Sequence, residues 1–384
     1  MALVLAVAHA LGMSFAMFWQ ILWPLILGFT ISAVIQASVS KEKIVRLLGD
    51  HRPATLLKAC GLGAASSSCS YAAVAIARSI FRKGADFTAA MTFEIASTNV
   101  VLELTIIMIV FLGWQFALAE VVGAVAMVTI LALLFRWRLT PKLLAGATAQ
   151  ANEGLAGRME GHADMHMPAP AGGGLLARIR SPGGRTTISH YFVMDWASVW
   201  IDIAGGLLIA GALAAWVPRE WWASVFLVSH PLLAKFWGPV IGPLIAILSF
   251  VCSVGNIPLA AVLWNGGISF GGVIAFIFAD LIVLPILDIY RRYYGSRMAW
   301  VIFSSFYAAM VGAALIVEFL FQALGLTPAA GGARATATMI TLNYTTVLNL
   351  VFLALAGILL RRFFKTGGPA MLRMMRMPSD SSGD

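Results

Sequence analysis

Long apolar stretches separated by short polar segments dominate the chain. A helix needs about 20 mostly apolar residues to cross a bilayer. Seven stretches meet this requirement: 13–37, 86–112, 114–135, 195–217, 270–290, 298–325 and 340–360. The pattern therefore predicts an all-α polytopic membrane protein with seven helices that cross the bilayer.

Two further apolar stretches are interrupted by small polar residues. Residues 59–80 break around Ser66–Ser70, and residues 238–263 break around Cys252–Pro258. At about 1.5 Å per helical residue, each stretch is long enough to cross the membrane once. Each could equally form a re-entrant hairpin of two half-helices that meet at a polar tip, so length leaves both arrangements open.

The distribution of Lys and Arg favours the hairpins. If both stretches cross fully, the loops hold 15 of these residues on one side and 11 on the other. If both re-enter, the split is 23 to 3, and the poorer side has only Arg219, Lys235 and Arg334. Because cytoplasmic loops carry the positive excess, we expect two hairpins, an N-terminus outside and a C-terminus in the cytoplasm.

A shift of 183 residues aligns 69–103 with 252–286 without gaps and superposes the two polar breaks. Seven identities fall in these 35 positions, and the pair Ser70 and Ser253 is one of them. Each half would hold three crossings and one hairpin. Because three is odd, the second half enters from the opposite side, which is the inverted repeat found in many secondary transporters.

The repeat predicts four segments. These are a first membrane repeat (1–135, hairpin 59–80), a cytoplasmic linker (136–190), a second membrane repeat (191–325, hairpin 238–263) and an extra transmembrane helix with a cytoplasmic tail (326–384). In the linker, His162, Met165 and His166 form a tract of the kind that can bind copper or a related metal. A flexible solvated loop is the simpler interpretation, so neither a metal nor another cofactor is expected.

The two tips carry residue types that a solute site needs. The half-helix after each break begins with unpaired N–H groups of partial positive charge. Such a site suits an anion or a polar neutral molecule, and cysteines would add soft sulfur ligands. The alternative is that small residues simply allow close helix packing. The candidate substrate-binding residues are Ser66, Ser67, Ser68, Cys69, Ser70, Cys252, Ser253 and Asn256.

Charged and amide side chains inside the predicted spans are costly and usually functional. Glu94 and Asn99 lie in one span, and Asp280 lies in another, at the repeat position equivalent to Ser97. A carboxylate in apolar surroundings can hold a proton at neutral pH and so couple transport to protons. These three residues are candidates for coupling or gating. The alternative is that neighbouring hydroxyl groups cap each carboxylate and that these residues serve packing alone.

Composition and charge exclude other classes of protein. Hydrophobic residues make up 60% of the chain and charged residues 11%, with a mean hydropathy of +0.88, whereas a soluble protein is about one-quarter charged. The net charge of +9 forms no basic stripe with interleaved aromatics, so nucleic acid is not an expected partner. The expected partners are the lipid bilayer and a small-molecule or ion substrate.

The chain has no GxxxxGK[ST] motif, so it is not expected to be its own ATP motor. An intramembrane thiol enzyme built from Cys69 and Glu94 is an alternative, but no histidine lies in the predicted spans to activate a thiol. We therefore expect a permease rather than an enzyme. The permease would work by alternating access at the two tips. A passive channel is the closest rival.

Residues 61–116 and 249–295 resemble the two signatures of the predicted permease family that includes YraQ and the organoarsenical permease ArsP. The resemblance implies a multi-pass permease of the plasma membrane and, for some members, efflux of trivalent organoarsenicals. That arsenical branch carries Cys-Ser-Cys followed by proline. This chain has Ser67-Ser68-Cys69-Ser70, followed by Ala72 and Ala73, so the resemblance does not extend to a paired-thiol site at the first tip.

Overall fold

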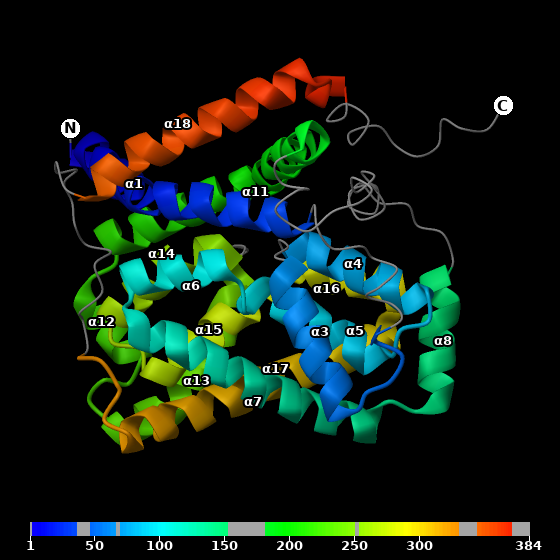
Figure 1. Cartoon of the computed structure of the whole chain (residues 1–384). Coiled ribbons are helices and arrows are strands. Elements are labelled where there is room, and N and C mark those ends of the chain that lie inside the picture. The colour runs from blue at the N-terminus through cyan, green and yellow to red at the C-terminus, as the bar shows by residue number, and fades with distance from the viewer. Residues whose placement is uncertain are drawn as a thin grey trace.

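The computed structural model describes residues 2–36, 47–66, 70–152, 181–249, 253–329 and 344–370 (Figure 1). Every regular element in these ranges is a helix, which confirms the predicted all-α class. The helices are α1 (Ala2–Gln36), α3 (Pro53–Ser66), α4 (Ser70–Arg82), α5 (Phe87–Asn99), α6 (Leu102–Phe111), α7 (Trp114–Arg138), α8 (Pro141–Asn152), α11 (Pro182–Trp216), α12 (Arg219–Val225), α13 (Pro231–Ser249), α14 (Ser253–Asn265), α15 (Phe270–Phe278), the short 3₁₀-helix η1 (Ala279–Leu281), α16 (Leu284–Tyr294), α17 (Ser296–Ala323) and α18 (Tyr344–Lys365).

Helix length and composition support a polytopic membrane protein. Within the described ranges, five helices are long and apolar enough to cross a bilayer, and the number rises to seven if each of two bent helix pairs is one span. The five stretches are Val4–Ile31, Trp114–Arg138, Pro231–Ser249, Ser296–Ala323 and Thr345–Lys365.

Two predicted spans are broken, which corrects the expectation of continuous helices at 86–112 and 270–290. The first consists of α5 and α6, bent by 42°, and the second of α15, η1 and α16, bent by 44°. Pro285 stands in the first turn of α16 and has no N–H with which to continue the preceding helix. Before the first break, the side chains of Ser97–Asn99 donate to carbonyls of their own helix, which competes with regular helix continuation.

The predicted span 195–217 lies almost wholly within the long helix α11, which includes the apolar stretch Ile203–Trp216. The expected linker 136–190 contains α8 and the first turns of α11.

The two predicted hairpins correspond to the pairs α3–α4 and α13–α14. Helix α13 alone is long and apolar enough to span a bilayer, so the first arm of the second hairpin is longer than expected from 238–263. The break predicted at Cys252–Pro258 needs a correction, because Ser253–Pro258 already belong to α14. The residues between the arms of each pair, 67–69 and 250–252, lie outside the described part of the chain.

Helix boundaries recur with the offset of 183 residues that the sequence predicts. Helices α4 and α14 begin and end 183 residues apart. Asp86 caps α5 by accepting the N–H of Ala89 at 3.1 Å, and Ser269 caps α15 by accepting the N–H of Gly272 at 3.1 Å. The two halves therefore place their N-caps at equivalent positions.

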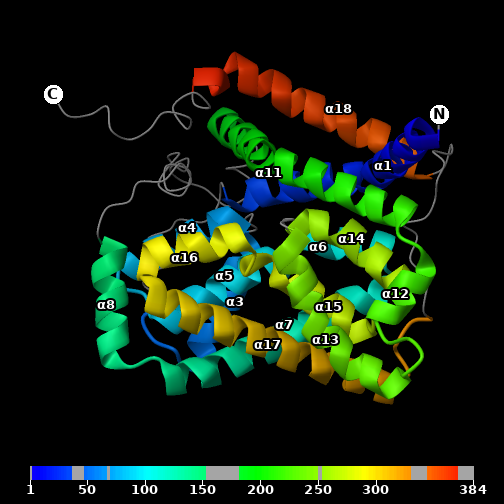
Figure 2. The ribbon, with the colours of Figure 1, turned by 180° about the vertical axis from the view of Figure 1, so that it is seen from behind.

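Equivalent helices of the two halves run in opposite directions. Helix α4 extends from the centre towards α8, whereas its equivalent α14 extends from the centre to the opposite end (Figures 1 and 2). Likewise, α16 extends towards α8 and its equivalent α6 extends to the opposite end. The packing partners also recur between the halves. Helix α3 packs on α5 and α13 packs on α15, while α4 packs on α16 and α14 packs on α6. This is the relationship that an inverted repeat produces.

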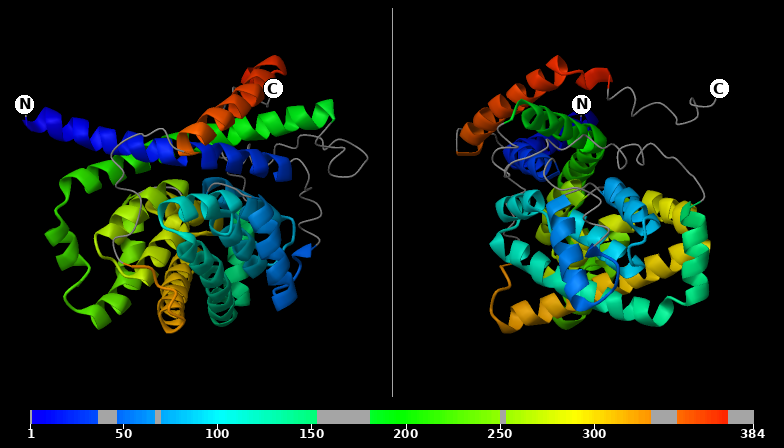
Figure 3. Two further views of the ribbon diagram at one scale, coloured as in Figure 1. Left: turned by 60° about the vertical axis from the view of Figure 1, so that its left-hand side comes forward. Right: turned by 45° about the vertical axis from the view of Figure 1, so that its right-hand side comes forward.

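Helices α1, α11 and α18 form a separate layer above the other helices in Figures 1 and 3. The fully buried amide of Asn349, on α18, joins that helix to α1. It donates to the carbonyl of Trp19 at 2.7 Å and accepts the N–H of Trp23 at 3.0 Å. These two backbone groups are four residues apart and lie just before Pro24, where a proline disturbs the helical ladder.

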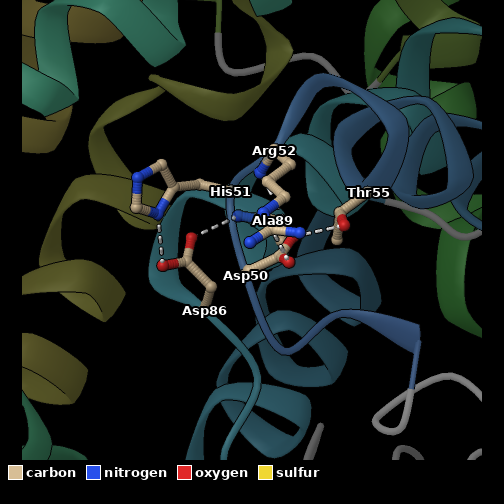
Figure 4. A network of polar contacts seen from close by, with 6 residues as sticks. All are labelled: Asp50, His51, Arg52, Thr55, Asp86 and Ala89. Atoms are coloured by element: carbon tan, nitrogen blue, oxygen red, sulfur yellow. Dashed lines mark hydrogen bonds and ion pairs between the residues drawn. The ribbon is translucent and has the colours of Figure 1, made fainter.

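At the end of the molecule where α8 lies, which we call the α8 side, two loops are tied together (Figure 4). The imidazole of His51 lies 3.1 Å from the carboxylate of Asp86, the N-cap of α5. Asp50 accepts hydrogen bonds from the hydroxyl of Thr55 and the N–H of Arg52. These bonds, with that of Thr55 the strongest, hold the pKa of the Asp50 carboxyl below its usual value.

Candidate functional site

Three side chains from different helices meet at the centre of the fold. The hydroxyl of Ser70 lies 3.1 Å from that of Ser253, and both donate to Oδ2 of Asp280, at 2.8 and 2.5 Å. Their exposed fractions are 1%, 6% and 0%. We call this group the central node. It brings together three of the residues that the sequence predicts for substrate binding or coupling.

The repeat explains why these residues meet. Ser70 is the first residue of α4 and Ser253 is the first residue of α14, so two half-helix N-termini from opposite halves converge. Asp280 belongs to η1, at the break between α15 and α16. The partial positive charge of a helix N-terminus favours a nearby carboxylate. The node therefore contains a carboxylate of the protein itself at the place where a bound anion was expected.

Several buried polar atoms on α5, α14 and η1 have no hydrogen-bond partner among the described residues. They are Oδ1 of Asp280, both amide atoms of Asn256 and Oδ1 of Asn99, and all three side chains are fully buried. Dehydrating such atoms without a partner costs free energy. Unpaired acceptors and an amide donor of this kind are suited to water or to a small polar solute.

Glu94 makes a contact that the sequence did not indicate. The hydroxyl of Tyr290, on α16, donates to Oε1 of Glu94, on α5. Both side chains are fully buried. The two residues are 196 positions apart, and no sequence pattern pairs them, so only the fold brings them together.

Two other carboxylates within the helices have different environments. Glu318 accepts the N–H of Gly271 at 2.5 Å and so helps to cap α15, which gives it a structural role. Glu120, on α7, is fully buried, and neither of its oxygen atoms has a hydrogen-bond partner in the described ranges. Sequence reasoning named no partner for either residue.

A hydrolase-like pattern also occurs in the second half. Residues Gly267–Gly271 match G-x-S-x-G, which in hydrolases places a nucleophilic serine between a strand and a helix. Here a helical segment precedes the motif, and the hydroxyl of Ser269 accepts the N–H of Gly272 as an N-cap. The serine is thus used to begin α15.

Not every predicted site residue can be compared with the structure. Ser66 ends α3 and is partly buried. Among the residues that the structure describes, no group of three or more His, Cys, Asp or Glu side chains could hold a metal ion. The predicted residues outside the described ranges are Ser67, Ser68, Cys69, Cys252, His162, Met165 and His166.

Comparison with known proteins shows what the chain is similar to. Residues 6–319 match the family model ArsP_1, described as a predicted permease. A protein of Mycobacterium tuberculosis H37Rv named "Putative permease Rv2963" is 57% identical over 346 residues, which cover 90% of this chain and 85% of that protein. No solved structure matches the chain. With most of its length matched, the chain belongs to the predicted permease family ArsP_1.

Proposed function

We propose that this membrane permease is a secondary transporter that moves a small solute by alternating access at the central node. The observation that carries the proposal is the hydrogen bonding of Ser70 and Ser253 to Asp280, which joins half-helix N-termini from the two repeats. In inverted-repeat transporters, broken helices form the solute site and the repeats move around it. Separating the two tips would open the node to one side at a time.

The proposed solute site extends over both tips. Asp280, Asn99 and Glu94 line or gate the path, and a proton or solute gradient drives net movement. The N-terminus lies outside and the C-terminus in the cytoplasm of a plasma membrane, as the distribution of Lys and Arg favours. The proposed site residues at the tips are Ser66, Ser67, Ser68, Cys69, Ser70, Cys252, Ser253 and Asn256.

The node favours one class of solute among those expected from the sequence. A carboxylate already accepts two hydroxyl hydrogen bonds at the helix N-termini, so a second anion there would meet like charge. A neutral solute with hydroxyl groups would instead donate to Oδ1 of Asp280 and Oδ1 of Asn99, which have no hydrogen-bond partner among the described residues. Trivalent organoarsenicals, which carry such hydroxyls and which the family resemblance implies for some members, fit this chemistry, and their efflux is the proposed physiological direction.

The test uses purified protein in liposomes and methylarsonous acid as the probe, with arsenate as the anionic comparison. A carrier gives saturable counterflow, in which unlabelled solute inside accelerates uptake of labelled solute. We expect counterflow with methylarsonous acid and none with arsenate. Flux that is unsaturable and insensitive to solute on the other side would instead identify a passive channel.

Variants connect that flux to the node. Ser253→Ala removes one hydroxyl bonded to Asp280, and we expect it to reduce counterflow. The matched control is Ser249→Ala, because the hydroxyl of Ser249 donates only within its own helix, to the carbonyl of Ala246 at 3.0 Å. Equal flux in the two variants would contradict a solute site at the node. A search for a chemical product in the same vesicles tests the enzyme alternative.

A further inference from the structure

The carboxyl of Glu94 lies between the two repeats, and one of its two oxygens has no hydrogen-bond partner in the described part of the chain. Glu94 belongs to the first repeat and Tyr290 to the second, and the hydroxyl of Tyr290 donates to Oε1 of Glu94. Oε2 of Glu94 is buried and has no hydrogen-bond partner among the described residues. A carboxyl with an unpaired oxygen in an apolar interior is more readily tolerated as the neutral acid than as the charged form.

This pair is distinct from the central node and lies on one side of it. Helix α16 runs from the break beside Asp280 towards α8 (Figure 2), and Tyr290 lies along that helix. One turn farther along, the hydroxyl of Tyr294 is buried and has no partner in the described ranges, with its ring 6.4 Å from that of Tyr290. Protonatable groups therefore continue from Glu94 towards the α8 side.

The α8 end of this row is covered by a buried cation. Arg78, on α4, is 1% exposed and donates twice to the carbonyl of Ala151, near the end of α8, at 2.8 and 3.2 Å. Its guanidinium also lies 4.2 Å from the centre of the Tyr293 ring. Movement of α8 would uncover the end of α16 that carries the tyrosines.

Other ionisable groups near Glu94 do not neutralise it. Asp280 acts on it electrostatically as a like charge, and Tyr294 is within electrostatic reach. The buried cation on a helix packed against α5 is Arg78, whose guanidinium contacts the carbonyl of Ala151 and the ring of Tyr293. The ionisable residues on the helices packed against α5 are Lys58 and Cys60 of α3, Tyr71, Arg78 and Arg82 of α4, and Glu120, Arg136 and Arg138 of α7, of which only Arg78 and Glu120 are buried.

We infer that Oε2 of Glu94 is the binding site of a coupling proton, that Tyr290 positions this carboxyl, and that the proton exchanges with water on the α8 side. The role of this proton in transport rests on the proposed function. In one conformation Oε2 exchanges its proton with water on the α8 side, and after the repeats move it exchanges that proton with water on the opposite side. Tyr290 keeps its own proton and holds Oε1, so the free oxygen stays available.

Infrared spectroscopy of the protein in liposomes tests proton binding without any solute. We expect a C=O stretching band from a protonated carboxyl that decreases as the pH is raised and shifts in D2O. Glu94→Gln should remove this pH-dependent band, and Tyr290→Phe should shift it, because the hydrogen bond to Oε1 is lost. The matched control is Tyr307→Phe, since the hydroxyl of Tyr307 donates to the carbonyl of Val240 at 2.8 Å and has no contact with Glu94. An unchanged band in either Glu94→Gln or Tyr290→Phe would overturn the inference.

A transport measurement tests coupling separately. With methylarsonous acid as the probe, the ratio of pH-gradient-driven accumulation to counterflow should collapse in Glu94→Gln and fall in Tyr290→Phe, and it should not change in Tyr307→Phe. A purely structural hydrogen bond would lower both fluxes in proportion and leave the ratio constant, which would overturn the coupling role. If the native protein does not move the probe, the proposed function fails for that solute, while the infrared result still decides whether Glu94 binds the proton.

Discussion

The hydroxyls of Ser70 and Ser253 lie 3.1 Å apart and belong to residues separated by 183 positions, which is the offset of the internal repeat. Equivalent atoms of two inverted halves can touch only near the axis that relates them, so this contact marks the centre of the fold. One carboxylate breaks the symmetry there. The residue equivalent to Asp280 is Ser97, whose hydroxyl donates to the carbonyl of Glu94 within its own helix.

Asp280→Asn should abolish or strongly reduce transport while the protein still folds. The amide keeps one acceptor oxygen for the hydroxyls of Ser70 and Ser253, but it cannot carry the charge that the half-helix N-termini favour. Counterflow in liposomes measures the effect, and Asp288→Asn is the control, because Asp288 is half-exposed and paired with Arg291 and Arg292. Native flux in Asp280→Asn would show that transport does not require the central node.

Gly63→Ala should destabilise the protein by about 1–3 kcal/mol, as expected for overpacking a tight contact. A Cβ at Gly63 would clash with the carbonyl of Phe93 and lie 2.9 Å from Cβ of Ala96, so α3 could not approach α5 as closely. Gly61 is in the same helix and a Cβ there meets nothing within 4 Å. Gly61→Ala should therefore stabilise by up to about 1 kcal/mol through helix propensity. Thermal unfolding in detergent measures both, and effects of the same sign would contradict this packing.

Asn349→Ala should loosen α18 from α1 and cost about 2 kcal/mol, because it removes two hydrogen bonds to backbone groups. Those groups are the carbonyl of Trp19 and the N–H of Trp23. Hydrogen exchange at Trp23 should increase in the variant. Val347→Ala, at an exposed position of α18, provides the control. If exchange at Trp23 is equally protected in both variants, α18 does not hold this part of α1.

Acidification from about pH 7.5 to about pH 5.5, across the ordinary pKa of histidine, should destabilise the contact between α11 and α18. The hydroxyl of Thr366 donates to the carbonyl of Arg362, so Nε2 of His190 is the donor to that hydroxyl, at 2.8 Å, and Nδ1 is buried without a partner in the described ranges. Burial lowers the pKa of His190. The unfolded chain therefore takes up a proton that the folded state resists, and stability falls as the pH falls.

Unfolding temperatures at the two pH values measure this effect. His190→Gln should reduce the difference between them, whereas His230→Gln, at an exposed position, should leave the difference as in the native protein. An equal difference in all three proteins would show that His190 does not contribute.

The sequence predicts the features that depend on local pattern. Apolar length identified most of the helices, and the repeat placed Ser70 and Ser253 at equivalent positions, where the structure brings them into contact. Asp280 was recognised because a carboxylate in an apolar span is unusual. Its two hydroxyl partners follow from how the halves fold together, which no local pattern records.

Features that depend on helix ends or distant contacts were missed. The bend between α5 and α6 has no proline, so the apolar stretch looked continuous, whereas Pro285 was an available signal for the second bend. The hydrogen bond between Tyr290 and Glu94 joins residues 196 positions apart. The role of Glu318 in capping α15 likewise depends on a neighbouring helix, α17, rather than on the sequence around it.

A reversible cross-link at the node tests directly whether transport requires the two repeats to move apart there. Ser70→Cys and Ser253→Cys are combined in a chain whose three native cysteines are replaced, with a protease site inserted within 153–180. We expect oxidation to keep the two halves joined after cleavage and to stop counterflow, and we expect a reductant to restore both separation and transport. Halves that separate after oxidation, or joined halves that transport at the native rate, would contradict a moving solute site where the two repeats meet.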